Sequence, residues 1–159
     1  MFRSRELWSV ALVVLGMTIA VPLGSARVPK PKPDLDPESL RFTPPDQIKW
    51  VEAPNGGAAT AVLVGDPSKP GLYIVLTKWH AHHNSRPHSH PNDRYITVLS
   101  GTWWVNTGSN YDPDHMVPMP AGSYVVHPGG HVHYDGAKDG DAVLEIVGMG
   151  PATTTSAEK

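Results

Sequence analysis

Two histidines flank a single serine in the segment Arg86-Pro-His-Ser-His-Pro-Asn-Asp-Arg94. In an extended strand alternate side chains point to the same face, so His88 and His90 turn both imidazoles in one direction and can share one metal ion. The remaining ligands must come from elsewhere in the chain. The best candidate is a second segment, His127-Pro-Gly-Gly-His-Val-His133, which follows a short apolar strand pattern and also ends in histidines. Imidazole suits zinc, iron, copper and nickel, so the two segments together predict a transition-metal site.

The two segments resemble the paired motifs of the cupin family. The first family motif reads Gly, five residues, His-x-His, three or four residues, Glu, six residues, Gly; it agrees at three of five positions with His82, His88, His90, Arg94 and Gly101. The second reads Gly, five residues, Pro-x-Gly, two residues, His, three residues, Asn; it agrees at four of five positions with Gly122, Pro128, Gly130, His133 and Ala137. The resemblance implies an all-β, cupin-type jelly-roll β-barrel, or double-stranded β-helix. It also implies that His88, His90 and His133 hold one divalent ion, with iron, manganese, zinc and nickel as candidates.

The main departure from the motif is Arg94, which stands where the family has a glutamate ligand. Its guanidinium could clamp an anionic substrate near the barrel mouth. It could instead pair with an inward carboxylate such as Glu145, or the metal site could be lost and leave only a binding cavity. Asp93 could replace the missing ligand if the strand register shifted by one residue. The three-His thiol dioxygenases and β-diketone-cleaving dioxygenases of the same superfamily also lack this glutamate, so its loss does not by itself abolish metal binding.

Other histidines near the two motifs are candidates for supporting roles. His127 precedes the motif proline and is expected to line the cavity or to hydrogen-bond the substrate, so it joins Arg94 as a candidate catalytic residue. His131 is two residues from His133, so in a strand both side chains would lie on the same face. His131 lies beside a turn, however, where this alternation of side chains is a poor guide. His80, His82 and His83 are expected in a loop at the barrel rim, either solvated or as an auxiliary metal site or proton relay.

Composition and turn spacing indicate one β-rich domain. The chain has 159 residues, 40% of them hydrophobic, with 17 prolines and 15 glycines, which suits short strands and tight turns. No long amphipathic helical repeat occurs between positions 45 and 150, and turn signals recur every 8–15 residues. We expect strands at residues 47–52, 61–65, 72–79, 94–100, 102–106, 116–120, 123–127, 131–134 and 141–148, a bend at Gly101 and a loop over residues 110–115.

The ends of the chain differ from this middle part. Arg3 and Arg5 precede an apolar run over residues 7–21, and small residues follow it, so residues 1–26 are expected to be a cleaved signal peptide, with an uncleaved membrane anchor as the alternative. The apolar run is shorter than the roughly 20 residues that a membrane span requires. Residues 27–43 alternate proline with charge and are expected to be an extended linker. We place the barrel at residues 44–151 and a disordered tail at residues 152–159.

Charge and cysteine content narrow the possible functions. A net charge of −2 predicts no nucleic-acid partner, and the absence of cysteine excludes disulfides and thiolate ligands. We expect a periplasmic or secreted protein that binds one metal and a small, possibly anionic, molecule. The expected activity is that of a dioxygenase or an isomerase, and the alternative is a non-catalytic cupin that binds a sugar or metabolite. A homodimer is possible because dimers are common in the superfamily.

Overall fold

Two antiparallel β-sheets form the body of the protein in this computed structural model, which describes residue 36 and residues 38–159. Residues 42–159 make up one compact unit. The predicted signal peptide and most of the predicted linker lie outside the described residues. Within the described part, no helix is both long and apolar enough to cross a membrane.

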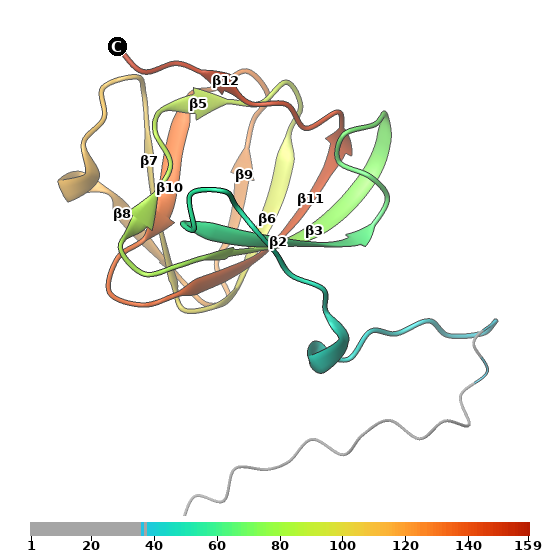
Figure 1. Ribbon diagram of the computed structural model, residues 1–159. Coiled ribbons are helices and arrows are strands. Elements are labelled where there is room, and N and C mark those ends of the chain that lie inside the picture. Colours follow the sequence, from blue (N-terminus) through green and yellow to red (C-terminus); the bar gives the residue numbers. More distant parts are fainter. Residues whose placement is uncertain (1–35, 37) are drawn as a thin grey trace, which may run out of the picture. The chain divides into compact units, whose positions relative to one another are not determined.

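The first of the two six-stranded sheets carries most of the core on its central strands. Alternation of buried and partly exposed residues along Ala142–Gly150 is typical of a strand with one face turned inward. The order is β1 (Val51–Glu52), β2 (Ala58–Val64), β3 (Gly71–Trp79), β11 (Ala142–Gly150), β6 (Arg94–Ser100) and β9 (Tyr124–His127). Figure 1 labels the strands from β2 to β9 of this order.

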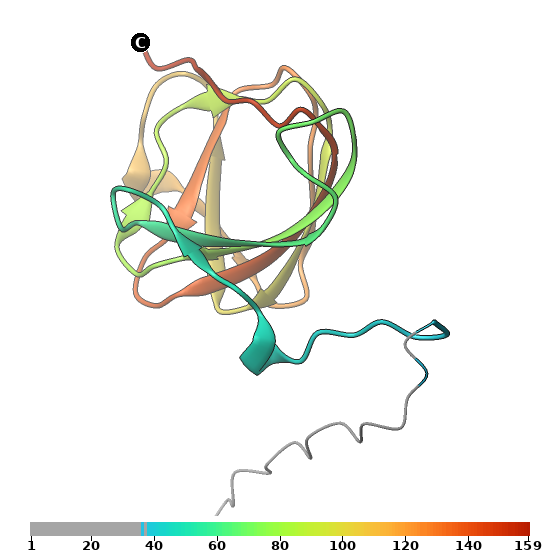
Figure 2. The ribbon, with the colours of Figure 1, turned by 45° about the vertical axis from the view of Figure 1, so that its right-hand side comes forward.

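The second sheet supplies the histidines. Its order is β12 (Thr155–Ser156), β5 (His88–Ser89), β10 (His133–Ala137), β7 (Thr102–Thr107) and β8 (Val117–Pro120), and β4 (His83–Asn84) pairs with β10. The strands of both sheets encircle a common interior in Figure 2. Their inner faces share a buried cluster around Ile96, Val98, Trp103 and Leu144. The predicted jelly-roll barrel is confirmed.

Gly101 makes the bend between β6 and β7 that the sequence predicts. Its φ is +73°, and a Cβ at this position would lie 2.1 Å from the carbonyl oxygen of Asp141. Only glycine adopts this conformation without strain and leaves room for the neighbouring strand. The bend lets β6 end in one sheet while β7 begins in the other.

The strand predictions differ from the structure mainly near the ends of the barrel. The expected strand over residues 47–52 is reduced to β1, because Pro45 begins a 3-10 turn, η1 (Pro45–Gln47). The loop expected over residues 110–115 contains a second such turn, η2 (Pro113–His115). The strand expected at residues 131–134 instead begins at His133 and continues to Ala137, where β7 supplies backbone partners.

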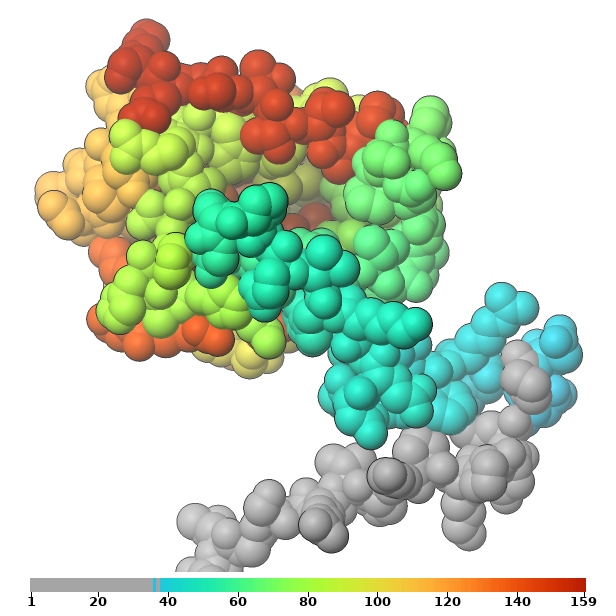
Figure 3. Space-filling model, in the orientation of Figure 1, coloured from blue at the N-terminus to red at the C-terminus, as the bar shows by residue number. Residues whose placement is uncertain are grey.

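The expected disorder of residues 152–159 is wrong. Thr155 and Ser156 form β12 and pair with Ser89 and His88 of β5. The segment lies beside β5 in Figure 1, and in Figure 3 it covers one end of the barrel as the red chain. Its order comes from backbone bonds and an ion pair to residues far away in the sequence, which its Thr- and Ser-rich composition does not reveal.

Candidate metal centre

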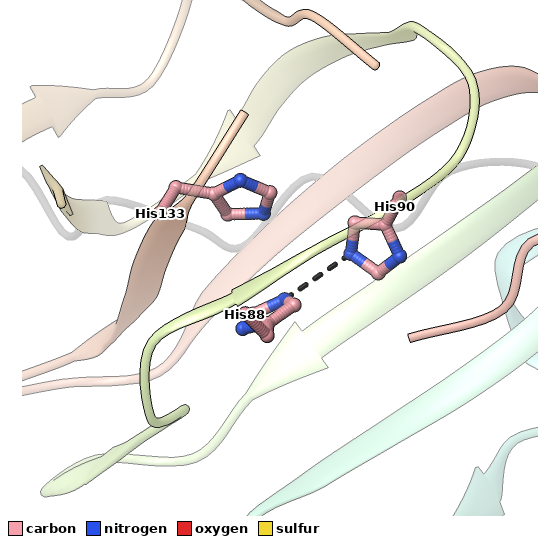
Figure 4. A group of neighbouring side chains, drawn as sticks. All are labelled: His88, His90 and His133. Atoms are coloured by element: carbon pink, nitrogen blue, oxygen red, sulfur yellow. Dashed lines mark hydrogen bonds between the residues drawn. The ribbon is translucent and has the colours of Figure 1, made fainter. Parts of the chain in front are cut away.

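The three histidines assigned by the motifs come together at one point inside the barrel. The β5–β10 ladder places His133 directly opposite His88, and His90 follows two residues after His88. One ring nitrogen from each lies within 4.8 Å of the other two. Figure 4 shows the imidazoles around a common space, with the contact of 3.1 Å between the Nε2 atoms of His88 and His90 as a dashed line. The predicted convergence of the three rings is confirmed.

Backbone carbonyls determine which nitrogen of each ring carries the proton. The Nδ1 atoms of His88, His90 and His133 lie 2.7, 2.9 and 3.1 Å from the carbonyl oxygens of Arg86, Thr153 and His131. A carbonyl oxygen only accepts, so each Nδ1–H donates and each Nε2 keeps a lone pair. Two bare Nε2 atoms at 3.1 Å cannot bond each other, but they can bind a cation between them. The donor set therefore fits a divalent metal ion, and the carbonyls orient its ligands.

The pKa values of His90 and His133 favour the neutral form that metal binding requires. Burial, together with the positive charge of Arg94, lowers the pKa of His90 to about 4. Burial, together with the neighbouring His127, lowers the pKa of His133 to about 3. Burial also lowers the pKa of His127 to about 4. These histidines are uncharged near neutral pH, so a metal ion does not have to displace protons from them.

Arg94 points into the barrel and occupies the place of the family glutamate. It lies opposite His127 in the β6–β9 ladder. Its Nη2 donates to His127 Nδ1 and to His133 Nε2, each at 3.1 Å. Burial lowers the pKa of its guanidinium. Arg94 thus uses the one lone pair of His133 that a metal ion would need.

Glu145 and Asp93 do not take the roles considered for them in the sequence. Glu145 pairs with Thr97, whereas Arg94 pairs with Gly148, so the two side chains project from opposite faces of the sheet and cannot meet. Asp93 has not replaced the missing ligand, because it is exposed and its Oδ1 accepts a bond from the backbone N–H of Gly129 at 2.7 Å.

A match to a protein family agrees with the cupin fold and the grouped histidines described above. A model of the ChrR cupin-like domain matches residues 39–153, which is well over half of the chain. The chain belongs to this cupin family. Residues 154–159 lie beyond the match. No curated protein is similar enough in sequence to count as a match.

Solved structures share the cupin fold at low sequence identity. A polyketide cyclase, RemF from Streptomyces resistomycificus, has a TM-score of 0.62 and 15% identity over 76% of this chain and 87% of its own. An uncharacterized double-stranded β-helix protein from Klebsiella pneumoniae has a TM-score of 0.56 and 22% identity over 76% and 99%. KdgF from Halomonas sp. has a TM-score of 0.54 and 20% identity over 69% and 94%. At these identities the similarity shows the fold alone.

A buried carboxylate, Asp135, completes the interior of this cupin and was not singled out in the sequence. Its oxygens accept bonds from Trp103 Nε1 at 3.0 Å and Ser85 Oγ at 2.9 Å. Burial by itself raises the pKa of Asp135, but the charge of Arg94 and the nearby histidines outweigh it, and the pKa is lowered. Asp135 therefore balances the charge of Arg94. The sequence could have indicated Asp135 through strand alternation, because it is two residues from His133 on the same strand and its side chain therefore points to the same face.

The centre opens into a cavity of about 470 Å³. In the space-filling view the surface is hollowed beneath the C-terminal segment (Figure 3). Two buried donors on its walls, Trp79 Nε1 and Arg94 Nε, have no acceptor among the described residues. The cavity wall includes His88, His90, Arg94, Arg86, Trp79, Asp135, Thr154 and Ser156.

The remaining histidines lie outside the centre. His127 is buried, with its ring centroid 3.9 Å from that of His133. It is not among the residues that line the cavity, and a hydrogen bond from His127 to a substrate stays a prediction. His131 is exposed and contributes only its carbonyl. His80 contacts Glu52 at 3.0 Å and Asp141 at 3.6 Å. Within residues 36 and 38–159, no second group of three potential ligands lies close enough to hold a metal.

Proposed function

We propose that this cupin is a metal-dependent enzyme that acts on a small anionic molecule. His88, His90 and His133 would hold one divalent transition metal. The observation that carries the proposal is the set of three Nδ1–H groups directed at backbone carbonyls, which turns all three Nε2 lone pairs toward one point. A random group of core histidines would have no reason to share this tautomer.

Charge balance supports an anionic substrate. The three ligands are neutral, and the family glutamate that would supply a negative charge is Arg94 here. Within the barrel the charge of Arg94 is offset by Asp135, so the charge of a divalent ion would stay uncompensated. A carboxylate or a similar anion entering the cavity would supply the missing charge.

Arg94 is the residue proposed to bind that anion. For His133 to use its Nε2 on a metal, the Nη2 of Arg94 must give up this bond and donate elsewhere. A carboxylate in the cavity offers two acceptor oxygens that match the guanidinium. His127 would keep Arg94 in place through its Nδ1. The bound metal would supply Lewis-acid polarisation, or dioxygen activation if it is iron(II).

Replacing Arg94 by glutamate is expected to tighten metal binding by at least about tenfold. The change removes a cation next to the ion and restores a carboxylate that can serve as a fourth ligand. Isothermal titration with Zn²⁺ measures the affinity. Arg94→Met removes the charge and the bonds to His127 and His133 but adds no carboxylate, so it should give a smaller gain. Equal affinity in Arg94→Glu and the wild type would show that position 94 does not face the ion.

The alternative function is a binding module without catalysis. It is favoured by the Arg94 bond to His133, which occupies one of the three lone pairs. Two measurements distinguish the enzyme from the binding module. The first is metal analysis of protein purified without added metal. The second is an assay of the iron-, zinc-, manganese- and nickel-loaded forms against carboxylates, thiols, diketones and phenols. Turnover that depends on one metal supports the enzyme. Tight binding of an anion without turnover in any loaded form supports the binding module.

The proposed cellular location is the periplasm or the exterior of the cell. Its support is the charge and apolar pattern of residues 1–26. The N-terminal sequence of the mature protein tests it, and cleavage near position 26 is the expected result.

A further inference from the structure

Residues 153–158 have contacts that connect them directly to the centre. We call these residues the strap. The strap pairs with β5, the strand that carries His88, through Thr155 and Ser156. The backbone N–H of Ala157 also donates to the carbonyl of Pro87 at 2.9 Å. The strap therefore lies against the first histidine segment along most of its length.

One backbone atom of the strap acts on a ligand. The carbonyl oxygen of Thr153 lies 2.9 Å from Nδ1 of His90. This acceptor holds the proton on Nδ1, leaves the lone pair on Nε2 and fixes the rotation of the ring. For His88 and His133 the corresponding acceptors lie only two residues away in the chain, at Arg86 and His131. His90 alone depends on a segment 63 residues away.

The strap also forms part of the cavity wall and is fastened at its end. Thr154 and Ser156 line the cavity together with His88 and His90. Glu158 forms a two-point ion pair with Arg86, with one contact at 2.9 Å, and the guanidinium of Arg86 lies 3.8 Å from the ring centroid of Tyr111. The Arg86 and Glu158 side chains are 59% and 31% exposed, so this pair is accessible to water and can open.

We propose that the strap is required for the geometry of the metal site. Thr153 is a positioning residue for His90, and the Arg86–Glu158 ion pair holds the end of the strap in place. The proposal rests on the proposed metal-binding function for its consequences, but the arrangement of His90 can be tested without metal. When the strap is detached, His90 should lose its single tautomer and its fixed orientation. The other two histidines should keep theirs.

The first experiment compares the full chain with a variant that ends at Ala152 and a control that lacks only Lys159. Nitrogen NMR of metal-free protein should show His90 with Nδ1 protonated in the full chain and the control, and as a mixture of tautomers in the shorter variant. Spectroscopic titration with Co²⁺ should show about 10–100-fold weaker binding in the shorter variant, as expected for loss of a partner behind a metal ligand. An unchanged His90 tautomer and unchanged Co²⁺ affinity in a folded shorter variant would overturn the proposal.

A second set of full-length variants covers the case in which the shorter chain does not fold. Glu158→Arg places two guanidinium groups together and should shift the His90 tautomer and weaken Co²⁺ binding with little change in melting temperature. The exchange Arg86→Glu with Glu158→Arg should restore both, because the ion pair is re-formed. Identical NMR and Co²⁺ results for Glu158→Arg and the wild type would also overturn the proposal. Equal Co²⁺ binding by the wild type and His88→Ala would instead contradict the proposed function, while the metal-free NMR result would still decide the role of the strap.

Discussion

Replacing His133 by alanine is expected to reduce metal affinity by more than about 100-fold. Loss of a partner behind a ligand costs about 10–100-fold, and loss of the ligand itself must cost more. Only three neutral ligands are available in the described centre, so no carboxylate compensates for the loss. The metal content of the purified variant should fall from near one per chain to near zero, as measured by elemental analysis.

His131→Ala is the matched control for this result. His131 lies two residues away, its side chain is exposed, and its contact with His133 is made by the backbone carbonyl, which alanine retains. The control should keep its metal. Retention of metal by His133→Ala, or loss from both variants, would remove His133 from the site.

Replacing Asp135 by alanine is expected to destabilise the fold by about 3–5 kcal/mol. This is the usual effect of removing one partner of a buried charge pair, because the other charge stays buried without compensation. Asp135 offsets the charge of Arg94, and its loss also leaves Trp103 Nε1 and Ser85 Oγ without their acceptor. Urea unfolding of the two proteins measures the difference.

A double variant identifies the cause of this loss. Arg94→Met combined with Asp135→Ala removes both charges, so it should be more stable than Asp135→Ala alone. Asp112→Ala is a surface control, because the exposed Asp112 side chain accepts bonds from His115 and its contacts with Tyr134 are made by the backbone, which alanine retains. This variant should lose much less stability than Asp135→Ala. A double variant no more stable than Asp135→Ala would mean that packing, not charge, explains the effect.

The fold could be predicted because its signals are local. The strands expected over residues 94–100 and 141–148 and the bend expected at Gly101 each follow from a few neighbouring residues, and β6, β11 and the bend confirm them. The errors lie where distant segments decide the outcome. The strap has no apolar period of its own, and its backbone is ordered by partners such as Pro87 and Ser89. Such partners cannot be inferred from a Thr- and Ser-rich segment.

The sequence predicted the three candidate ligands of the centre but not the residues around them. His88 and His90 share a face through strand parity, and the motif spacing adds His133. The bonds from Arg94 to His127 and His133 could not be foreseen, because they depend on the β6–β9 register. The role of Asp135 could not be predicted for the same reason, since it depends on the charge of Arg94, which lies 41 positions away in the chain.

By itself the sequence determined the barrel and the identity of three candidate ligands, since both follow from alternation and spacing over short distances. Only the tertiary structure decided that Arg94 lies among those ligands, that Asp135 balances it and that the strap holds His90 in place. The physical reason is that burial, charge compensation and ring orientation depend on which strands are neighbours. Strand neighbours are set by the closed sheet as a whole, and no single segment specifies them.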